Sequence, residues 1–333
     1  MDERTFARPR LVISKCIEFD RCRYNGEMIP SEFVKRLMTY VDFIPVCMEV
    51  EIGLGVPRDP IRVIQLEDGL HLFQPSSGKD FTVPAKQFSA QFLAGQEDVD
   101  GFLLKSRSPS CGVKNVKVYP MGEKVASLTA KGTGFFGQEV IAKFSDLAIE
   151  DEDRLRNLRI GEHFLTRIFA LAEARALRDD PSVRSLIDFH ARNKLLLMYY
   201  SQKELAAMGN IVANRKGAAI DAMVEEYVHH LRSALVRPPR CGSGTNVMLH
   251  AFGYVSDHLN SEEKALFLDA LHRYREGKLP MTVATGMVRS WIARFNVPYL
   301  RQQTFLQPFP AEFLELMSND ACIGRDLWSQ VGE

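Results

Sequence analysis

Three cysteines in the first half of the chain, Cys16, Cys47 and Cys111, each end or closely follow a short apolar run of β type. In a parallel α/β sheet the loops leaving the carboxyl ends of the strands converge on one crevice, so we expect these thiols to lie close together. Their spacing is neither that of a zinc ribbon, which pairs cysteines two apart, nor that of a ferredoxin run.

Soft thiolates select zinc, copper(I) or an iron–sulfur cluster. Three cysteine ligands on a cubane cluster would leave one iron open to act as a Lewis acid on a bound molecule. The alternative is that the three cysteines are small buried hydrophobic residues, as free cysteines often are.

The stretch LKSRSPSCG (104–112) leaves an apolar run through basic, hydroxyl-bearing and proline residues before it reaches the third cysteine. Arginine suits bidentate contacts to oxyanions, so cations beside the cysteines are candidates to neutralise a ligand phosphate. The alternative for each of them is solvated surface charge. Four such residues flank the cysteine blocks: Arg23, Arg58, Lys105 and Arg107.

Two further motifs carry weaker signals. GTGFFG (132–137) fits G-x-G-x-x-G, but the run before it is a poor strand and no acidic partner follows, which argues against a dinucleotide site. A helix N-terminus preceded by glycines can still receive a phosphate. In the second half, polar residues recur every four positions on one expected helix face, where they suit hydrogen bonding between helices or a metal or nucleic-acid role: Asn246, His250, Tyr254 and His258.

The elements that must position the cysteines alternate between strand and helix patterns up to about residue 150. Segments 10–16, 42–47 and 101–106 read as strands, and 61–66 with 70–74 reads as a hairpin joined by Glu67-Asp68-Gly69. Segments 31–41, with Ser31 as its cap, and 83–95 read as helices. This alternation predicts an α/β domain with a largely parallel sheet.

Beyond the charged stretch IEDEDRLRN (149–157) only helical patterns occur, at 159–177, 182–213, 217–236, 244–258, 261–276 and 281–295. The third has a clean apolar stripe that includes Met223, Tyr227 and Leu231. We therefore expect two domains, an α/β domain over residues 1–150 and an all-α helical bundle over residues 151–333.

From its composition we expect the protein to be cytoplasmic, and the composition excludes few classes of partner. The 333 residues carry a formal net charge of zero, so nothing global points to nucleic acid or to an anionic membrane. The N-terminus is charged where a signal peptide needs an apolar stretch, and no run approaches the roughly 20 apolar residues of a spanning helix. Six cysteines in a chain of this length do not make a disulfide scaffold.

The blocks VISKC…RYNG, PVCMEVEIGLGVPR and KSRSPSCG resemble the three signature blocks of the thiouracil desulfidase family. The second half resembles the YbgA-like domain that is often fused behind it, through DFHARNKLLLMYYSQ, NVMLHAFGYVSDHL and YLRQQTFLQPFP. The resemblance implies a 4Fe-4S cluster held by Cys16, Cys47 and Cys111. It also implies removal of sulfur from a thiolated pyrimidine base or nucleotide, with release of hydrogen sulfide.

The same resemblance implies roles for Glu49, two places after the second cysteine, and Ser108, three places before the third. A carboxylate beside the cluster can act as general base on water and then as acid. A hydroxyl can relay a proton or donate to developing negative charge. Without the resemblance, Glu49 would read as a surface carboxylate and Ser108 as a cap or turn residue.

The chain departs from the family pattern at two positions. Met48 stands where the family usually has proline, and Cys22 stands where many relatives have an apolar residue. Cys22 would be a fourth ligand that closes the cluster, a sulfur acceptor, or a plain buried thiol. If it closes the site, the alternative function is a non-catalytic metal-binding or interaction protein, whose helical domain binds a partner or nucleic acid.

Overall fold

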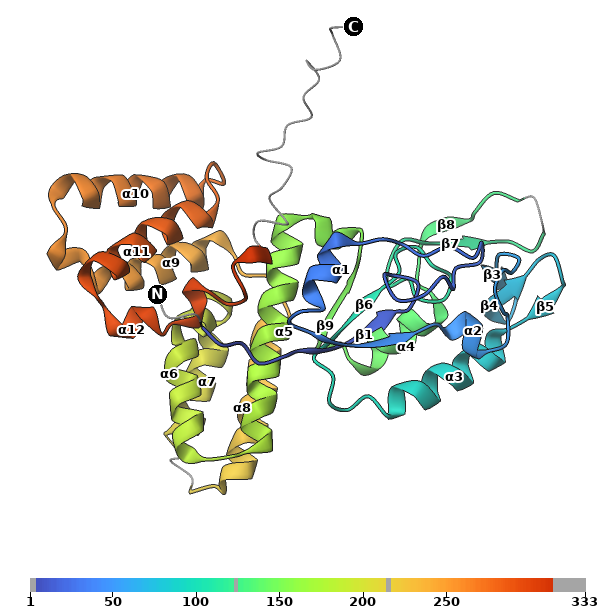
Figure 1. Cartoon of the computed structure of the whole chain (residues 1–333), viewed down its shortest axis with the longest axis horizontal. Helices are drawn as coiled ribbons and strands as arrows, with labels where there is room; N and C mark the ends of the chain where they lie inside the picture. Colours follow the sequence, from blue (N-terminus) through green and yellow to red (C-terminus); the bar gives the residue numbers. More distant parts are fainter. Residues whose placement is uncertain (1–3, 123–124, 214–216, 314–333) are drawn as a thin grey trace, which may run out of the picture. The chain divides into compact units, whose positions relative to one another are not determined.

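The computed structural model describes residues 4–122, 125–213 and 217–313 of the chain (Figure 1). These residues form two compact units, 8–172 with 311–313 and 4–7 with 173–310. The division falls inside helix α5 (Leu158–Asp179). Each unit is described by itself below.

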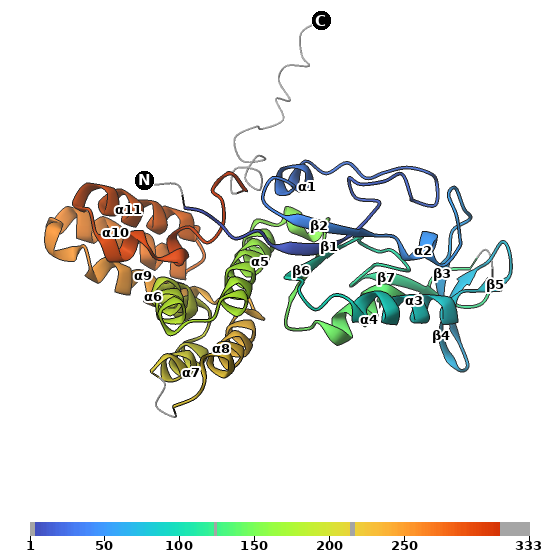
Figure 2. The same ribbon diagram turned by 60° about the horizontal axis from the view of Figure 1, so that its bottom comes forward.

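A four-stranded parallel sheet forms the centre of the first unit. Its strands β1 (Arg10–Ser14), β2 (Asp42–Val46), β6 (Gly101–Leu104) and β9 (Ala148–Asp151) lie in the order β2-β1-β6-β9. Figure 2 shows β2, β1 and β6 side by side. β6 is buried along its whole length, as is β1 from Leu11 onward, which is typical of parallel strands covered on both faces. The predicted α/β domain with a largely parallel sheet is confirmed.

A second, mixed sheet was not predicted as a separate layer. Its strands are β3 (Arg62–Leu66), β4 (Gly69–Gln74), β5 (Lys79–Asp80), β7 (Val116–Tyr119) and β8 (Thr129–Gly132), in the order β5-β4-β3-β7-β8. The predicted hairpin is present, because β3 and β4 pair antiparallel from Leu66–Gly69 outward. β5 has only two residues and β8 has little apolar character, and each pairs with the strand that precedes it, whereas β7 joins the sheet by pairing with β3, where Val118 lies opposite the distant Val63.

Four helices accompany these sheets: α1 (Glu32–Leu37), α2 (Met48–Glu51), α3 (Thr82–Ala94) and α4 (Phe135–Lys143). Ser31 caps α1 as predicted, since its hydroxyl accepts the Val34 amide hydrogen at 3.3 Å. The helices α3 and α4 pack against each other, and one buried core joins residues of both sheets and both helices, among them Val12, Val63, Leu93 and Phe136.

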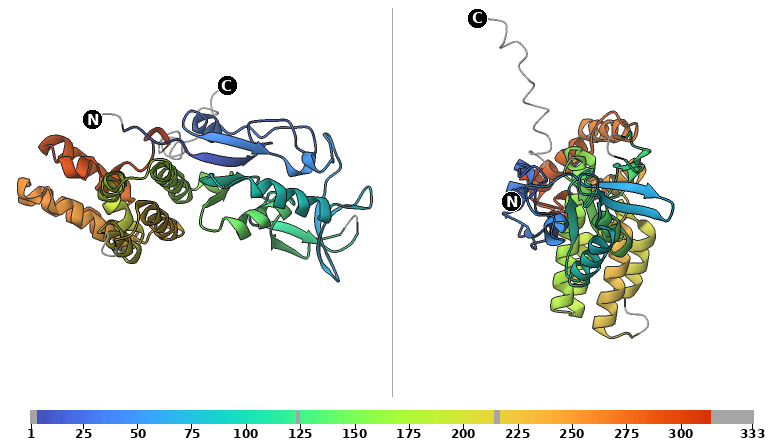
Figure 3. Two further views of the ribbon diagram at one scale, coloured as in Figure 1. Left: turned by 90° about the horizontal axis from the view of Figure 1, so that it is seen from below. Right: turned by 90° about the vertical axis from the view of Figure 1, so that its right-hand side faces the viewer.

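The second unit is helical, as predicted. Its elements are α6 (Val183–Tyr200), α7 (Gln202–Val212), α8 (Ile220–Leu235), α9 (Cys241–Gly253), α10 (Ser261–Arg275), α11 (Met281–Phe295) and the short α12 (Pro298–Arg301). The left view of Figure 3 looks nearly along α6, α7 and α8, which lie side by side. The predicted stripe of α8 is buried at Met223, Tyr227 and Leu231.

Two helical predictions differ from the structure. The segment 182–213 is two helices, because Ser201 takes an extended conformation and caps α7 by accepting the Glu204 amide hydrogen. The helix expected over 244–258 ends at Gly253, so Tyr254 and His258 do not continue its polar face. Their rings instead stack on Tyr299 and Phe295.

None of the helices in the described part of the chain has the length and apolarity that crossing a bilayer requires.

Candidate functional site

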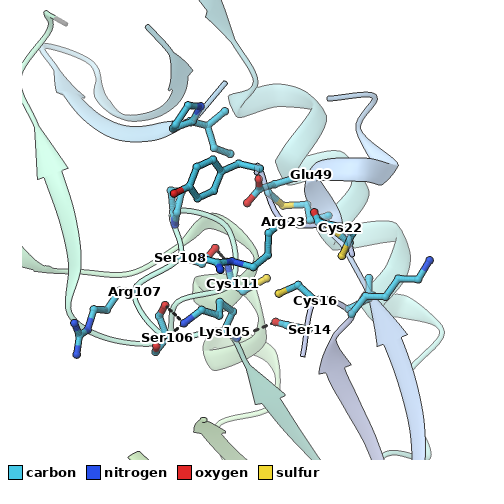
Figure 4. Close-up of a pocket in the computed structure, with 18 of the residues that line it drawn as sticks. Ser14, Cys16, Cys22, Arg23, Glu49, Lys105, Ser106, Arg107, Ser108 and Cys111 are labelled. Carbon is cyan, nitrogen blue, oxygen red and sulfur yellow. Dashed lines mark hydrogen bonds between the residues drawn. The ribbon is translucent and has the colours of Figure 1, made fainter. Parts of the chain in front are cut away.

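A cavity of about 340 Å³ lies in the first unit where the carboxyl ends of the parallel strands meet (Figure 4). Cys16 follows β1 by two residues, Cys47 follows β2 directly, and Lys105 follows β6 directly. All ten residues singled out from the sequence line it: Cys16, Cys22, Arg23, Cys47, Glu49, Arg58, Lys105, Arg107, Ser108 and Cys111. The convergence of loops at one sheet edge explains how cysteines so far apart in sequence reach a common cavity.

The cysteines of this cavity form a set of neighbouring, largely buried thiols. The pKa of Cys22 is raised to about 11, first by a hydrogen bond with the Cys16 thiol. The pKa of Cys47 is raised further, first by its hydrogen bond with Cys22 and then by burial. Cys22 is therefore a neighbour of both other thiols, and the raised pKa values keep the Cys22 and Cys47 thiols neutral at pH 7 when nothing is bound to them.

Cys111 completes the set from the other side. Burial raises the pKa of its thiol to about 12, and a hydrogen bond with Ser14 opposes that shift. In Figure 4 the sulfur atoms of Cys16 and Cys111 point toward each other. Across 4–122, 125–213 and 217–313, however, no three His, Cys, Asp or Glu side chains are arranged to hold a metal ion together.

The donor set nevertheless fits an iron–sulfur cluster in its chemistry. Clusters are held by cysteine thiolates, and this cavity offers several thiols with no histidine on its wall. A thiolate set spread around a cavity suits a multi-iron group better than a single tetrahedral ion, which draws its sulfur ligands in to about 2.3 Å. Binding would require the neutral thiols to lose their protons.

Glu49 is clamped from two sides. The Arg58 guanidinium lies against Oε2, with Nε at 2.8 Å and Nη2 at 2.6 Å, while the Ser110 hydroxyl donates to Oε1 at 2.7 Å. The Glu49 and Arg58 side chains are only 15% and 4% exposed, so Glu49 is no ordinary surface carboxylate. The first turn of α2 holds Glu49, directly after the strand end that carries Cys47.

Ser108 organises the turn that carries Cys111. Its hydroxyl oxygen accepts the amide hydrogens of Ser110 and Cys111, each at 3.1 Å, and its carbonyl accepts the Gly112 amide hydrogen at 2.9 Å. The turn begins at Arg107, whose φ of 56° is left-handed. Because the Ser108 oxygen acts as acceptor in both bonds, its own hydrogen remains available to another group.

The four predicted cations have different surroundings. Besides Glu49, the Arg58 guanidinium donates to the carbonyls of Gly55 and Cys22, at 2.7 and 3.0 Å. Lys105 pairs with Glu152 and bonds Ser106. Arg23 lies 3.4 Å from Glu27.

Arg107 is the most open of the four, with 75% of its side chain exposed and Asp153 at 3.7 Å. Figure 4 shows it pointing away from the cysteines.

Several polar residues of the site were missed. Glu152 and Asp153 follow β9 and receive hydrogen bonds from Ser106, so they belong to the same edge of the sheet. Ser14 accepts the Lys105 amide hydrogen, and Ser110 bonds Glu49. Ser110 was visible beside Cys111 in the sequence, but its link to Glu49 spans 61 positions and only the folded chain creates it.

The GTGFFG motif supports the cysteine loop. The amides of Gly134, Phe135 and Phe136 donate to the carbonyls of Gly112, Pro109 and Ser110, at 2.7, 3.0 and 2.8 Å. These helix N-terminal donors are therefore engaged by protein carbonyls and do not receive a phosphate. β8, which precedes the motif, is antiparallel to β7, whereas a dinucleotide fold needs a parallel strand there.

In the second unit, His190 of α6 bonds the hydroxyl of buried Tyr227 of α8 at 3.1 Å, which is a hydrogen bond between helices. Cys241 lies at the start of α9. Cys322 lies outside the described residues.

Both halves of the chain are similar to known protein families. Residues 11–152 match the family model described as 2-thiouracil desulfurase, and residues 194–310 match DUF1722, a family of unknown function. The chain is 28% identical over 154 residues to the uncharacterized protein YbgA of Escherichia coli (strain K12), which covers 46% of this chain and 91% of YbgA. It is 29% identical over 109 residues to the uncharacterized protein YbbK of Bacillus subtilis (strain 168), which covers 31% of this chain and 72% of YbbK.

Among solved structures, the [4Fe-4S]-dependent thiouracil desulfidase TudS is similar with a TM-score of 0.36 and 25% identity, over 44% of this chain and 93% of TudS. Both resemblances inferred from the sequence are confirmed by the family models and YbgA. The N-terminal region of the chain thus matches the 2-thiouracil desulfurase family model, and its C-terminal region matches DUF1722.

Proposed function

We propose that this protein is a desulfidase that replaces the sulfur of a thiolated pyrimidine with oxygen from water. The net change is C=S plus water to C=O plus hydrogen sulfide, so atoms balance and no oxidant or reductant is consumed. The observation that supports it most is that thiols and a clamped carboxylate line one cavity within the residues that match the 2-thiouracil desulfurase model.

Cys16, Cys47 and Cys111 would hold a 4Fe-4S cluster. When bound, the cluster supplies a Lewis-acidic iron that makes the carbon of the C–S bond electrophilic. The protein has three further tasks, which are to orient the base, to remove a proton from water and to stabilise the negative charge that develops during attack.

Glu49 and Ser108 have contacts suited to the last two tasks. Glu49 is a largely buried carboxylate that opens on the cavity and can take a proton from water, then return it to the leaving sulfur. Ser108 lies on the cavity wall with its hydroxyl hydrogen unclaimed by the two amides it accepts, so it can donate to developing charge.

Arg107 has the most open side chain of the four cations, because Arg58 and Lys105 are held by buried carboxylates and Arg23 lies beside Glu27, so we assign the substrate phosphate to it. We expect Arg107→Ala to raise the KM for 4-thiouridine monophosphate about tenfold, the size of one charge-assisted contact, and to leave the KM for 2-thiouracil unchanged. An equal effect on base and nucleotide would remove the phosphate role.

The function is tested by anaerobic purification, quantification of iron and sulfide, and assay of sulfide release from 2-thiouracil and from 4-thiouridine monophosphate. Release should depend on iron content and disappear in Glu49→Gln, which keeps the shape of the side chain but cannot act as a base. A fully loaded protein that releases no sulfide from either compound would refute the proposed substrate class.

A second candidate is a non-catalytic metal-binding protein in which Cys22 closes a four-cysteine site. The hydrogen bonds of Cys22 with Cys16 and Cys47 support it, because they bring a fourth thiol to the same donor set. The two candidates differ in what loss of the Cys22 thiol does to bound iron.

A further inference from the structure

The two oxygens of Glu49 have different surroundings. A carboxylate oxygen offers about two acceptor positions. Oε2 receives two N–H groups of one guanidinium, from Nε at 2.8 Å and Nη2 at 2.6 Å, so its acceptor positions are filled. Within the described residues Oε1 receives one hydrogen bond, from the Ser110 hydroxyl at 2.7 Å, and keeps one position open.

Each clamp is itself held in place. Arg58 donates to the carbonyls of Gly55 and Cys22, which ties the guanidinium to two loops around the cavity. Ser110 is fully buried, its amide donates to Ser108, and its carbonyl accepts the amide hydrogens of Phe136 and Gly137 at the start of α4. The Arg58 side chain cannot rotate away without breaking its bonds to both carbonyls, and the backbone bonds of Ser110 fix the position from which its hydroxyl reaches Glu49.

We propose that Arg58 and Ser110 are positioning residues that leave Glu49 Oε1 as the one atom able to accept the proton of the attacking water. The inference rests on the proposed function. In this step a water O–H bond breaks, its proton goes to Oε1, and the water oxygen bonds to the thiocarbonyl carbon. The proton then leaves Oε1 for the sulfur as the C–S bond breaks, and the remaining hydroxyl proton is lost as C=O forms and joins the hydrosulfide ion to give hydrogen sulfide.

The arrangement assigns different tasks to the two clamps. Arg58 occupies Oε2 and sets the plane of the carboxylate, while Ser110 sets the direction of the remaining acceptor position on Oε1. Loss of Arg58 or Ser110 should therefore slow the proton transfer more than it weakens substrate binding, because neither residue is assigned a contact to the pyrimidine.

The test compares Ser110→Ala, Ser110→Thr, Arg58→Lys and a matched control, Ser89→Ala. Ser89 is as fully buried as Ser110, and its hydroxyl donates to the Ala85 carbonyl of its own helix and lies 3.7 Å from the Met48 sulfur, so Ser89→Ala removes a buried hydroxyl near the site that does not bond Glu49. Iron content is measured for each variant, and kcat and KM for 2-thiouracil are measured on loaded protein.

In Ser110→Ala we expect kcat to fall about tenfold to a hundredfold, the size of one hydrogen bond to a charged group, with KM and iron content unchanged. Ser110→Thr should restore most of the rate. The kcat of Arg58→Lys should lie between those of Ser110→Ala and Ser110→Thr, since an ammonium ion cannot reproduce the paired contact to Oε2.

A readout independent of turnover keeps the inference testable if the assigned substrates are wrong. Crystal structures of wild type and Ser110→Ala should show the Glu49 carboxylate in one orientation in the first and displaced in the second. If the wild-type protein releases no sulfide at all, the proposed function is refuted. The orientation of the Glu49 carboxylate in the two crystal structures would still show whether Ser110 positions it. An unmoved carboxylate, or Ser110→Ala with wild-type kcat while Glu49→Gln is inactive, would overturn the inference.

Discussion

Gly137, in the first turn of α4, lies directly against the carbonyl of Cys111, and a Cβ there would sit 2.7 Å from that oxygen and 2.6 Å from the carbonyl oxygen of Gly112. Both obstacles are backbone atoms and cannot rotate aside. The helix can pack on the cysteine loop only because this position has no side chain.

We therefore expect Gly137→Ala to push α4 away from the Cys111 loop. The free energy of unfolding should fall by about 1–3 kcal/mol, the range for overpacking a close contact, and iron bound after reconstitution should fall with it. Urea unfolding and iron analysis measure the two effects. Gly95→Ala is the control, because a Cβ at Gly95 would have its nearest neighbour at 3.8 Å, and it should behave as wild type.

Removal of single thiols should distinguish ligands from neighbours. Under the proposed function, Cys16→Ala, Cys47→Ala and Cys111→Ala lose the cluster, whereas Cys22→Ser keeps it and still releases sulfide. The physical reason is that three cysteines already anchor the group. Iron and sulfide analysis with visible absorption spectra gives the answer, and Cys241→Ser, in the helical unit, serves as control. Loss of iron in Cys22→Ser would favour the closed four-cysteine site.

The pair of carboxylates around His71 predicts a pH-dependent contribution to stability. His71 Nδ1 lies 2.6 Å from Asp80 and Nε2 lies 3.0 Å from Asp68. The hydrogen bond with Asp80 is the main cause that raises the pKa of His71 above 6.5. A raised histidine pKa stabilises the fold fully below the unfolded value, and the effect disappears as pH rises through the folded value.

His71→Gln should therefore lower the free energy of unfolding more at about pH 5.5 than at about pH 8.5. Urea unfolding of both proteins at the two pH values measures the difference. Asp80→Asn should show the same trend between these pH values, since it removes the main partner of the imidazolium. A loss that is equal at both values, or greater in alkali, would contradict the assignment.

Gln303 inserts into the hydrogen-bond ladder of helix α6. Its amide nitrogen donates to the Ala191 carbonyl at 2.9 Å, and its amide oxygen accepts the Leu195 amide hydrogen at 3.1 Å. These two backbone groups are four residues apart, so the side chain bridges a pair that would normally bond each other. Gln303 is only 3% exposed, which keeps water from replacing it.

Gln303→Ala should lower the free energy of unfolding by about 2–3 kcal/mol, because it leaves buried backbone groups without partners. Gln302→Ala, at the exposed neighbouring position, should be close to neutral. Chemical unfolding followed by circular dichroism compares them. Equal stability of the two variants would mean that α6 closes its own ladder when the side chain is removed.

Much of the site was accessible to sequence reasoning because it follows from strand ends. Cys16, Cys47 and Cys111 all follow parallel strands, and parallel strands bring their carboxyl ends to one edge. The helical character of the second half was equally predictable, since apolar stripes such as that of α8 depend only on local periodicity. The second sheet was not predicted, because β7 joins it through the distant strand β3, and β5 and β8 are short additions to β4 and β7 with weak strand patterns of their own.

The sequence by itself determined the alternation of strands and helices, the order of the cysteine blocks and the family of each half, all of which are encoded in residues that are near one another. Only the tertiary structure decided that Arg58, which the sequence suggested as a phosphate ligand, instead pairs with Glu49. It also decided that Ser110 bonds the same carboxylate and that GTGFFG packs against the Cys111 loop. The physical reason is that hydrogen bonds between distant loops depend on how the chain packs, and side-chain type alone does not specify them.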